Sequence, residues 1–276
     1  MNPIPQFLRA NTPYRALEQS VRVARKTAQA RAYWRSRPIN HLSRQGYELV
    51  PPVLNADECK RLCSVADSLL RDESYFINQD CYLSVRKEKG MQIDVNVRQV
   101  MNLHAYDPAV KALFDSGKLE QMFVERLGEP VKLESITLQV DDVDTEKKRG
   151  YHLDSAWPPR LKVFTYLSPV DELGDGPYTV IPRSHVDLWR KVGNRFFNAT
   201  RGFPHDDMRL GYDDNGCVPL LGPAGTTILS TQDIVHKGWH DHHRSRRYNL
   251  ISYLCLERFW DGKPFALGRD RIKPKA

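Results

Sequence analysis

The chain has 276 residues, of which 41% are hydrophobic, 10% aromatic and 27% charged. This composition excludes a disordered chain because it supplies ample apolar material for a core, and the length suits one large domain or two small ones. The longest apolar run, residues 250–256, is much shorter than the roughly 18 residues of a membrane-spanning helix. The sequence therefore predicts no transmembrane segment.

The net charge of +7 is concentrated at the N-terminus. Residues 1–45 contain nine Lys and Arg residues against one acidic residue, Glu18, whereas the rest of the chain has 32 basic and 33 acidic residues. A nucleic-acid-binding domain needs its positive charge on the folded body, so we expect no nucleic-acid partner.

The basic segment is expected to form a helix over residues 14–34, with Leu17, Val21, Ala24 and Ala28 along one stripe. Three interpretations of this N-terminal arm stay open: a solvated helix held against the body, a peripheral contact with an anionic membrane or partner, and a transit peptide for organellar import. The five cysteines form no CxxC pair and fit reduced thiols. We expect a cytoplasmic protein, with organellar import as the alternative.

The remaining residues, 46–276, are expected to form a single domain. Helices are predicted at 55–71, 107–114, 118–127 and 186–192, and strands at 46–50, 131–140, 161–167, 178–181, 225–230 and 247–256. Helices in the first half and short strands in the second predict an α+β fold, with an antiparallel barrel or sandwich buttressed by helices.

Three His-x-Asp tripeptides occur, where nine histidines and 34 acidic residues predict about one by chance. His205 lies in a polar loop and His185 precedes a predicted helix, but His152 and Asp154 are expected on a strand. Residues i and i+2 of a strand point to the same side. His152 and Asp154 would therefore supply two of the three ligands of a facial site that suits non-haem Fe(II).

The third ligand must come from a distant segment that the fold brings alongside. The stretch from His236 to His243 contains four histidines, and only His236 directly follows a strand-like segment, residues 224–235. A 2-oxoglutarate cosubstrate would also need an arginine to bind its far carboxylate. Arg246 and Arg247 open the last predicted strand on opposite faces, and their positions alone do not decide between them.

These residues resemble the phytanoyl-CoA dioxygenase family of Fe(II)- and 2-oxoglutarate-dependent oxygenases. The resemblance covers residues 46–258. It is carried by the segments Gly46-Tyr-Glu-Leu-Val50, Tyr151-His152-Leu-Asp154, Gly176-Pro-Tyr-Thr-Val-Ile-Pro-Arg-Ser-His185 and Gly222-Pro-Ala-Gly225 through His236 and Gly238 to Arg247.

The resemblance implies a double-stranded β-helix, also called a jelly roll. It implies that His152, Asp154 and His236 bind Fe(II), that Arg247 binds the far carboxylate of 2-oxoglutarate, and that O2 is the second cosubstrate. Gln139 and Thr165 fall where cosubstrate contacts are common in the family. His185 is structural there, not a ligand.

Three residues depart from the family pattern: Arg183 replaces a glycine, and Gly238 and Asn249 stand where serines are common. None of them removes a metal ligand. The family activity implies hydroxylation of an unactivated C–H bond in a small-molecule, lipid or other metabolite substrate, with release of succinate and CO2. Asp154 favours hydroxylation over halogenation, because halogenases of this type leave that position to the halide.

Two alternatives belong to other functional classes. A non-catalytic jelly-roll binding protein would have lost a ligand or the arginine, and neither is missing. A zinc-dependent hydrolase could use the same two histidines and aspartate but would have no use for Arg247. The sequence does not identify the substrate, the site of oxidation or the oligomeric state.

Overall fold

The structure is a computed structural model that describes residues 12–71, 77–78, 80–83, 97–143, 149–155 and 157–262. The helices are α2 (Thr12–Arg35), α3 (His41–Gln45), α4 (Ala56–Arg71), α5 (Pro108–Asp115), α6 (Lys118–Leu127) and α7 (Leu188–Arg201). The strands are β1 (Tyr47–Val50), β2 (Tyr82–Leu83), β3 (Val97–Met101), β4 (Val131–Asp141), β5 (Arg160–Tyr166), β6 (Tyr178–Val180), β7 (Val218–Pro219), β8 (Thr227–Thr231), β9 (His236–Gly238) and β10 (Arg247–Leu256).

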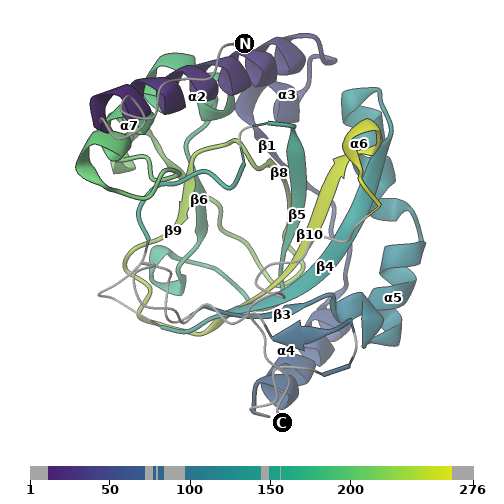
Figure 1. Cartoon of the computed structure of the whole chain (residues 1–276). Coiled ribbons are helices and arrows are strands. Elements are labelled where there is room, and N and C mark those ends of the chain that lie inside the picture. Colours follow the sequence, from purple (N-terminus) through teal and green to yellow (C-terminus); the bar gives the residue numbers. More distant parts are fainter. Residues whose placement is uncertain are drawn as a thin grey trace.

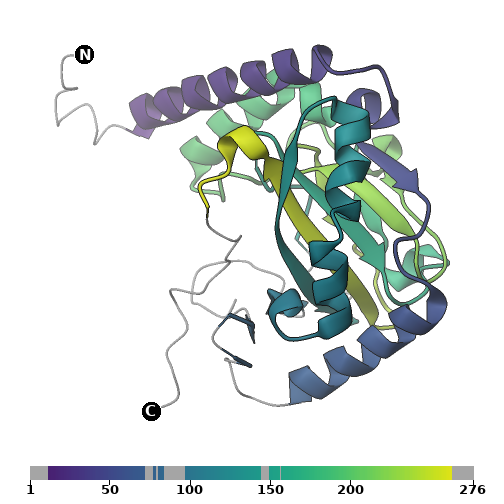
Figure 2. The ribbon, with the colours of Figure 1, turned by 90° about the vertical axis from the view of Figure 1, so that its right-hand side faces the viewer.

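The strands form two antiparallel sheets that face each other (Figure 1). The large sheet has the order β1-β8-β5-β10-β4-β3-β2, and the small sheet has the order β7-β6-β9. Helices cover the outer side of the large sheet, where α6 and α5 follow its length and α4 lies near one end (Figure 2). The expected α+β fold with a jelly-roll arrangement of strands and buttressing helices is confirmed.

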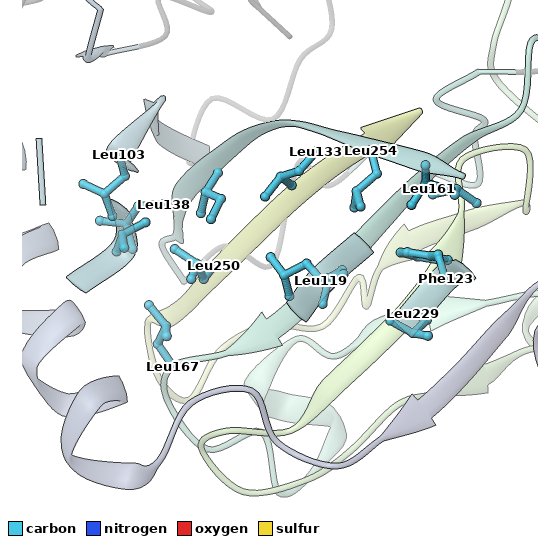
Figure 3. Close-up of a cluster of buried hydrophobic side chains, with 14 of the residues drawn as sticks. Leu103, Leu119, Phe123, Leu133, Leu138, Leu161, Leu167, Leu229, Leu250 and Leu254 are labelled. Carbon is cyan, nitrogen blue, oxygen red and sulfur yellow. The ribbon is translucent and has the colours of Figure 1, made fainter. Parts of the chain in front are cut away.

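Alternate residues of the large sheet face two separate apolar clusters, as strand geometry requires. On β5, Leu161 and Val163 join the cluster beneath the helices, whereas Phe164 and Tyr166 join the cluster between the sheets. Figure 3 shows the first cluster, in which Phe123 of α6 packs over the sheet. The inner face of β5 is therefore the one that can contribute to a site between the sheets.

Helix α2 packs against the body, mainly on α7, but through a stripe other than the predicted one. Its buried side chains include Ala16, Ala30 and Trp34, whereas Leu17 and Val21 are 56% and 61% exposed. The predicted stripe of Leu17, Val21, Ala24 and Ala28 is therefore not the buried face of α2. The helix instead buries small residues such as Ala16 and Ala30, whose short side chains permit close packing of two helices.

The C-terminal end of α2 is tied to the strand region. The Trp34 indole is buried, and its Nε1 donates a hydrogen bond to Asp233 Oδ2 over 3.0 Å. Residues 1–11 of the predicted arm lie outside the described residues. Exposed basic residues remain on the outer side of α2, and their contact with an anionic surface stays a prediction. No helix in the described part of the chain has the length and apolar character needed to cross a membrane.

Most predicted elements are present within one or two residues of their predicted ends. Asn55 caps α4 as expected: its Oδ1 accepts from the Glu58 amide over 2.9 Å, and Glu58 returns a contact to the Asn55 amide. No sequence pattern indicated α3, β2, β3, β7 or β9, all of which have five residues or fewer. Helix α7 continues to Arg201, beyond its predicted end at residue 192.

Candidate metal centre

The side chains of His152, Asp154 and His236 converge on one point. Their ligand atoms all lie within 4.8 Å of one another. Asp154 Oδ1 is 3.7 Å from His152 Nε2, and Asp154 Oδ2 is 3.4 Å from His236 Nε2. A metal ion bound about 2.0–2.2 Å from each atom needs ligand spacings of this order. The two histidines and one carboxylate predicted from the sequence are therefore brought together.

The backbone holds the two histidines beside each other. The His152 amide donates to the His236 carbonyl over 2.9 Å, and the His236 amide donates to the His152 carbonyl over 3.1 Å. This is an isolated antiparallel bridge rather than part of a regular strand, so the expectation of a strand through His152 and Asp154 was wrong. Asp154 is held separately, because its backbone N–H donates a hydrogen bond to the Gln232 carbonyl over 3.1 Å.

Backbone carbonyls also select the histidine tautomers. His152 Nδ1 lies 3.0 Å from the Gly150 carbonyl oxygen, and His236 Nδ1 lies 3.0 Å from that of Ile234. A carbonyl oxygen only accepts hydrogen bonds, so each Nδ1 carries the proton and each Nε2 presents its lone pair to the site, where that of His236 accepts from Lys162 Nζ over 3.2 Å. Metal-binding histidines are oriented in this way in proteins, and the donor set therefore fits a divalent cation.

The electrostatics favour neutral histidines and an ionised aspartate. Burial, followed by the neighbouring charge of His236, lowers the pKa of His152 to about 3. Burial, followed by the charge of Lys162, lowers the pKa of His236 to about 4. Burial works to raise the pKa of Asp154, but the neighbouring positive charges, of which the Lys162 ammonium is the strongest, together outweigh it and hold that pKa below its usual range. These are the protonation states that a bound metal ion requires.

Lys162 is a residue of the site that the sequence analysis missed. It lies on β5 with its side chain 5% exposed, and its Nζ is 2.8 Å from Asp154 Oδ2 and 3.2 Å from His236 Nε2. The ammonium also lies over the Tyr178 ring, 4.8 Å from the centroid. A signal was available: Lys162 is the one charged residue in the apolar run 161–167, and alternation places it on the same face as Phe164.

Arg247, not Arg246, points between the sheets. Its guanidinium lies over the Phe164 ring, 5.8 Å from the centroid, and Phe164 stacks on Tyr178, which in turn lies beside His236. Arg246 is half-exposed and pairs with Asp67 and Asp142 on the outside. Successive contacts through the Phe164 and Tyr178 rings therefore connect the arginine with the metal group.

The Arg247 guanidinium is already paired within the chain. Its Nε and one terminal nitrogen contact Asp141 Oδ2 over 3.1 and 2.7 Å, and the other terminal nitrogen donates to the Gly176 carbonyl. Asn249 and Gln139 donate to the same carboxylate over 2.7 and 3.0 Å. The predicted residue Gln139 thus lies in the arginine cluster, and Asp141 is a second residue that the sequence analysis missed.

Thr165, the remaining predicted contact, is not brought to this region. It is buried on the opposite face of β5 from Phe164, and its hydroxyl lies 3.4 Å from that of Thr227. The strand alternates its side chains, so a residue next to Phe164 in sequence cannot share its face. Thr165 therefore does not face the space between the sheets in which a cosubstrate would bind.

His185 lies apart from the metal group, in a buried junction of α2, α3 and the segment after β6. Its Nε2 is 3.1 Å from the Ser43 carbonyl oxygen, and its ring packs edge-on against Trp34. The neighbouring Arg183 has φ +66°, a left-handed conformation that favours glycine. Arg183 therefore holds a backbone conformation that a glycine would adopt at a lower steric cost.

No protein-family model and no curated protein matches the sequence. The fold does match solved structures. These include the non-haem, alpha-ketoglutarate-dependent epimerase SnoN from nogalamycin biosynthesis, with 17% identity over 88% of this chain and 95% of that one and a TM-score of 0.56. The chain shares the fold of a non-haem iron enzyme.

Two further structures extend the likeness. HygX from Streptomyces hygroscopicus with iron bound has 14% identity over 84% of this chain and 92% of that one, with a TM-score of 0.57. The non-haem, alpha-ketoglutarate-dependent carbocyclase SnoK from nogalamycin biosynthesis has 16% identity over 82% and 91%, with a TM-score of 0.56. At such identities the likeness concerns the fold, and the chemistry must be argued from the residues of this chain.

Proposed function

We propose that the protein is an Fe(II)- and 2-oxoglutarate-dependent dioxygenase that hydroxylates an unactivated C–H bond of a small-molecule, lipid or other metabolite substrate. The observation that carries the proposal is the convergence of two histidine Nε2 atoms and the Asp154 carboxylate, with both tautomers set by backbone carbonyls. Two histidines and one carboxylate on one face, with further positions open, are the ligand set of non-haem Fe(II) oxygenases.

His152, Asp154 and His236 would hold the iron. Bound iron, with 2-oxoglutarate and O2, supplies the oxidation of a C–H bond with release of succinate and CO2. Arg247 would bind the far carboxylate of the cosubstrate, and its burial at 4% exposure strengthens such a contact. Gln139 would support it through the carboxylate that both residues contact. The protein's further task is to hold the substrate C–H bond close to the metal while excluding water.

Hydroxylation is the proposed outcome because Asp154 fills the position that a halide would need in a halogenase. The names of SnoN and SnoK describe an epimerase and a carbocyclase, so this fold also serves other outcomes. A chlorinated product from the wild-type protein would contradict the assignment. Product analysis by mass spectrometry distinguishes a gain of one oxygen atom from epimerisation or ring closure.

The first test is the anaerobic addition of Fe(II) and 2-oxoglutarate to the purified protein. We expect a visible metal-to-ligand charge-transfer band that is absent from Asp154→Ala and weakened in Arg247→Met. Under air, the wild type should then form succinate from 2-oxoglutarate. Glu257→Gln, a change in an exposed residue of the turn after β10, serves as the control and should leave the band unchanged.

Each alternative function predicts a different result. A zinc-dependent hydrolase would bind Zn²⁺ tightly, give no band with 2-oxoglutarate and be indifferent to Arg247→Met. A non-catalytic binding protein would take up no metal after incubation and desalting. Either result would overturn the proposal.

A further inference from the structure

Lys162 places an ammonium directly beside the metal group. Its Nζ contacts Asp154 and His236, two of the three ligands, and its side chain is almost fully buried. An anion that completes the coordination of a metal held by these ligands must therefore lie beside this ammonium. No sequence motif drew attention to the residue, and its position is a property of the folded chain.

Arg247 supplies no net charge to the same region. Its guanidinium and the Asp141 carboxylate form an ion pair in which both side chains are at most 6% exposed. Arg149 is a second arginine near the site, and its charge lowers the pKa of His152. It pairs with Asp206 over 2.7 Å and with Asp207 over 3.3 Å. Both arginines are thus compensated by carboxylates of the chain itself.

The charge balance leaves one role for Lys162. A divalent metal ion, the Asp154 carboxylate and a dianionic 2-oxo acid together carry a net charge of −1. An uncompensated charge in a buried site raises the free energy of the complex, because the charge has lost its hydration without gaining a partner. The Lys162 ammonium brings the sum to zero, and it lies against two of the metal ligands, whereas Arg247 lies over the Phe164 ring, which stacks on Tyr178.

We propose that Lys162 is a cosubstrate-positioning residue whose ammonium binds the carboxylate by which a 2-oxo acid chelates the metal, while Arg247 binds the far carboxylate. This inference rests on the function proposed above. It divides the recognition of the two ends of the cosubstrate between two cations, Lys162 beside the metal ligands and Arg247 over the Phe164 ring. It also gives Lys162 two exclusive partners: Asp154 before the metal binds, and the bound anion afterwards.

Two ligands with the same number of carbon atoms distinguish the contact made by the chelating end of the cosubstrate from the contact made by its far end. 2-Oxoglutarate and 2-oxovalerate have the same chelating end, but 2-oxovalerate carries a methyl group in place of the far carboxylate. The full-length protein is loaded anaerobically with Fe(II), and the dissociation constant of each ligand is measured from the charge-transfer band or by calorimetry. Metal affinity is measured separately, by competition with a chelating dye.

Lys162→Met should weaken both ligands by a similar factor of about 10- to 100-fold, the loss expected for one charge-assisted hydrogen bond. Arg247→Met should weaken 2-oxoglutarate alone. The affinity for the metal in Lys162→Met should be unchanged or higher, because the ammonium no longer pairs with Asp154. Lys162→Arg, which keeps the charge, should recover part of the ligand affinity.

Lys237→Met is the matched control. Lys237 is a buried lysine adjacent to His236 in sequence, but its ammonium pairs with Asp214 and lies over the Tyr151 ring. Its loss should leave both ligand affinities unchanged. Circular dichroism and thermal unfolding establish that each variant is folded before the titrations.

Each other outcome overturns the inference. Equal affinities in the wild type and Lys162→Met show that the ammonium does not contact the chelating end. If Lys162→Met loses 2-oxoglutarate binding but binds 2-oxovalerate as the wild type does, Lys162 contacts the far carboxylate instead of the chelating one. Joint loss of metal and ligand binding assigns it a structural role. If the wild type itself gives no complex with Fe(II) and 2-oxoglutarate, the proposed function fails, a result distinct from a wild type that binds both and a variant that binds them equally well.

Discussion

Arg247 and Asp141 lie directly opposite each other on β10 and β4, and their side chains form a buried ion pair. The carboxylate also accepts hydrogen bonds from Asn249 and Gln139, so donors from two adjacent strands converge on it. If Arg247 binds a cosubstrate carboxylate as proposed, that carboxylate must share the guanidinium with Asp141. The strength of cosubstrate binding would then depend on Asp141, a residue that does not itself bind an anion.

Asp141→Asn should tighten 2-oxoglutarate binding, because the amide leaves the Arg247 charge uncompensated until a carboxylate arrives. The same change should lower stability in the absence of ligand by about 3–5 kcal/mol, the cost of breaking a buried ion pair. Thermal unfolding with and without 2-oxoglutarate measures both effects, and the ligand should raise the Tm of Asp141→Asn by more than that of the wild type. Weaker binding would instead show that Asp141 is needed to orient Arg247.

Asp154→Ala should reduce metal affinity by more than about 100-fold, since replacing even a supporting residue of a metal ligand costs 10- to 100-fold. Metal content after desalting and dye competition provide the measurement. Asp214→Ala is the matched control, because Asp214 pairs with Lys237 as Asp154 pairs with Lys162. Full metal content in Asp154→Ala would exclude this carboxylate from the site.

The lowered pKa values of His152 and His236, about 3 and 4, predict how the metal-free protein responds to acid. Unfolded histidines take up protons near pH 6.5, whereas these two stay neutral in the folded chain down to about pH 4. The unfolded state then binds more protons, so the free energy of unfolding falls as pH falls from about 6.5 to 4, by up to about 1.4 kcal/mol per unit for each histidine.

Urea unfolding at several pH values tests this sign. Replacement of both histidines by asparagine should flatten the pH dependence in this window. An equally steep dependence in the double variant would mean that His152 and His236 are not the groups responsible. Metal binding should likewise persist to about pH 5, well below the range in which exposed histidines lose their metal ions.

Trp34→Ala should destabilise the protein by about 3–5 kcal/mol, because it opens a cavity and leaves Asp233 without its indole donor. Trp34→Phe removes chiefly the hydrogen bond and should cost about 1–3 kcal/mol. Trp189→Ala, in a side chain that is 77% exposed, should change the free energy of unfolding by less than about 0.5 kcal/mol. Similar losses in Trp34→Ala and Trp189→Ala would contradict the packing of α2 on the body.

Arg183→Gly should stabilise the protein by about 1 kcal/mol, because a non-glycine residue at φ +66° carries a steric cost of that order. Arg183→Ala is the control: it removes the charged side chain but keeps Cβ, and it should give no such gain. Chemical denaturation measures both. A gain in Arg183→Ala equal to that in Arg183→Gly would point to the charge instead of the backbone.

The sequence predicted the main strands because alternation and turn residues mark them locally. The grouping of His152, Asp154 and His236 had a weaker basis, since three His-x-Asp tripeptides and four nearby histidines competed and the complete set came from the family resemblance. The buried face of α2 was not predictable from hydrophobicity, since it consists largely of small residues whose burial depends on the shape of α7. Lys162 carried a signal, a single charge in an apolar run, but its contacts with Asp154 and His236 come from segments far away in sequence. Asp141 stands at the end of β4, and its role depends on the register that places it opposite Arg247.

The backbone bridge between His152 and His236 means that the site keeps its shape without an ion. In small zinc-dependent domains, by contrast, the ligands are gathered only as the metal binds, and chelators unfold the protein. Here a chelator should remove the ion and leave the fold intact, and a bound metal should add stability only in proportion to its occupancy. One divalent ion should therefore replace another without refolding of the protein. Redox-inert cations can then be used to measure metal and ligand binding at this site without turnover.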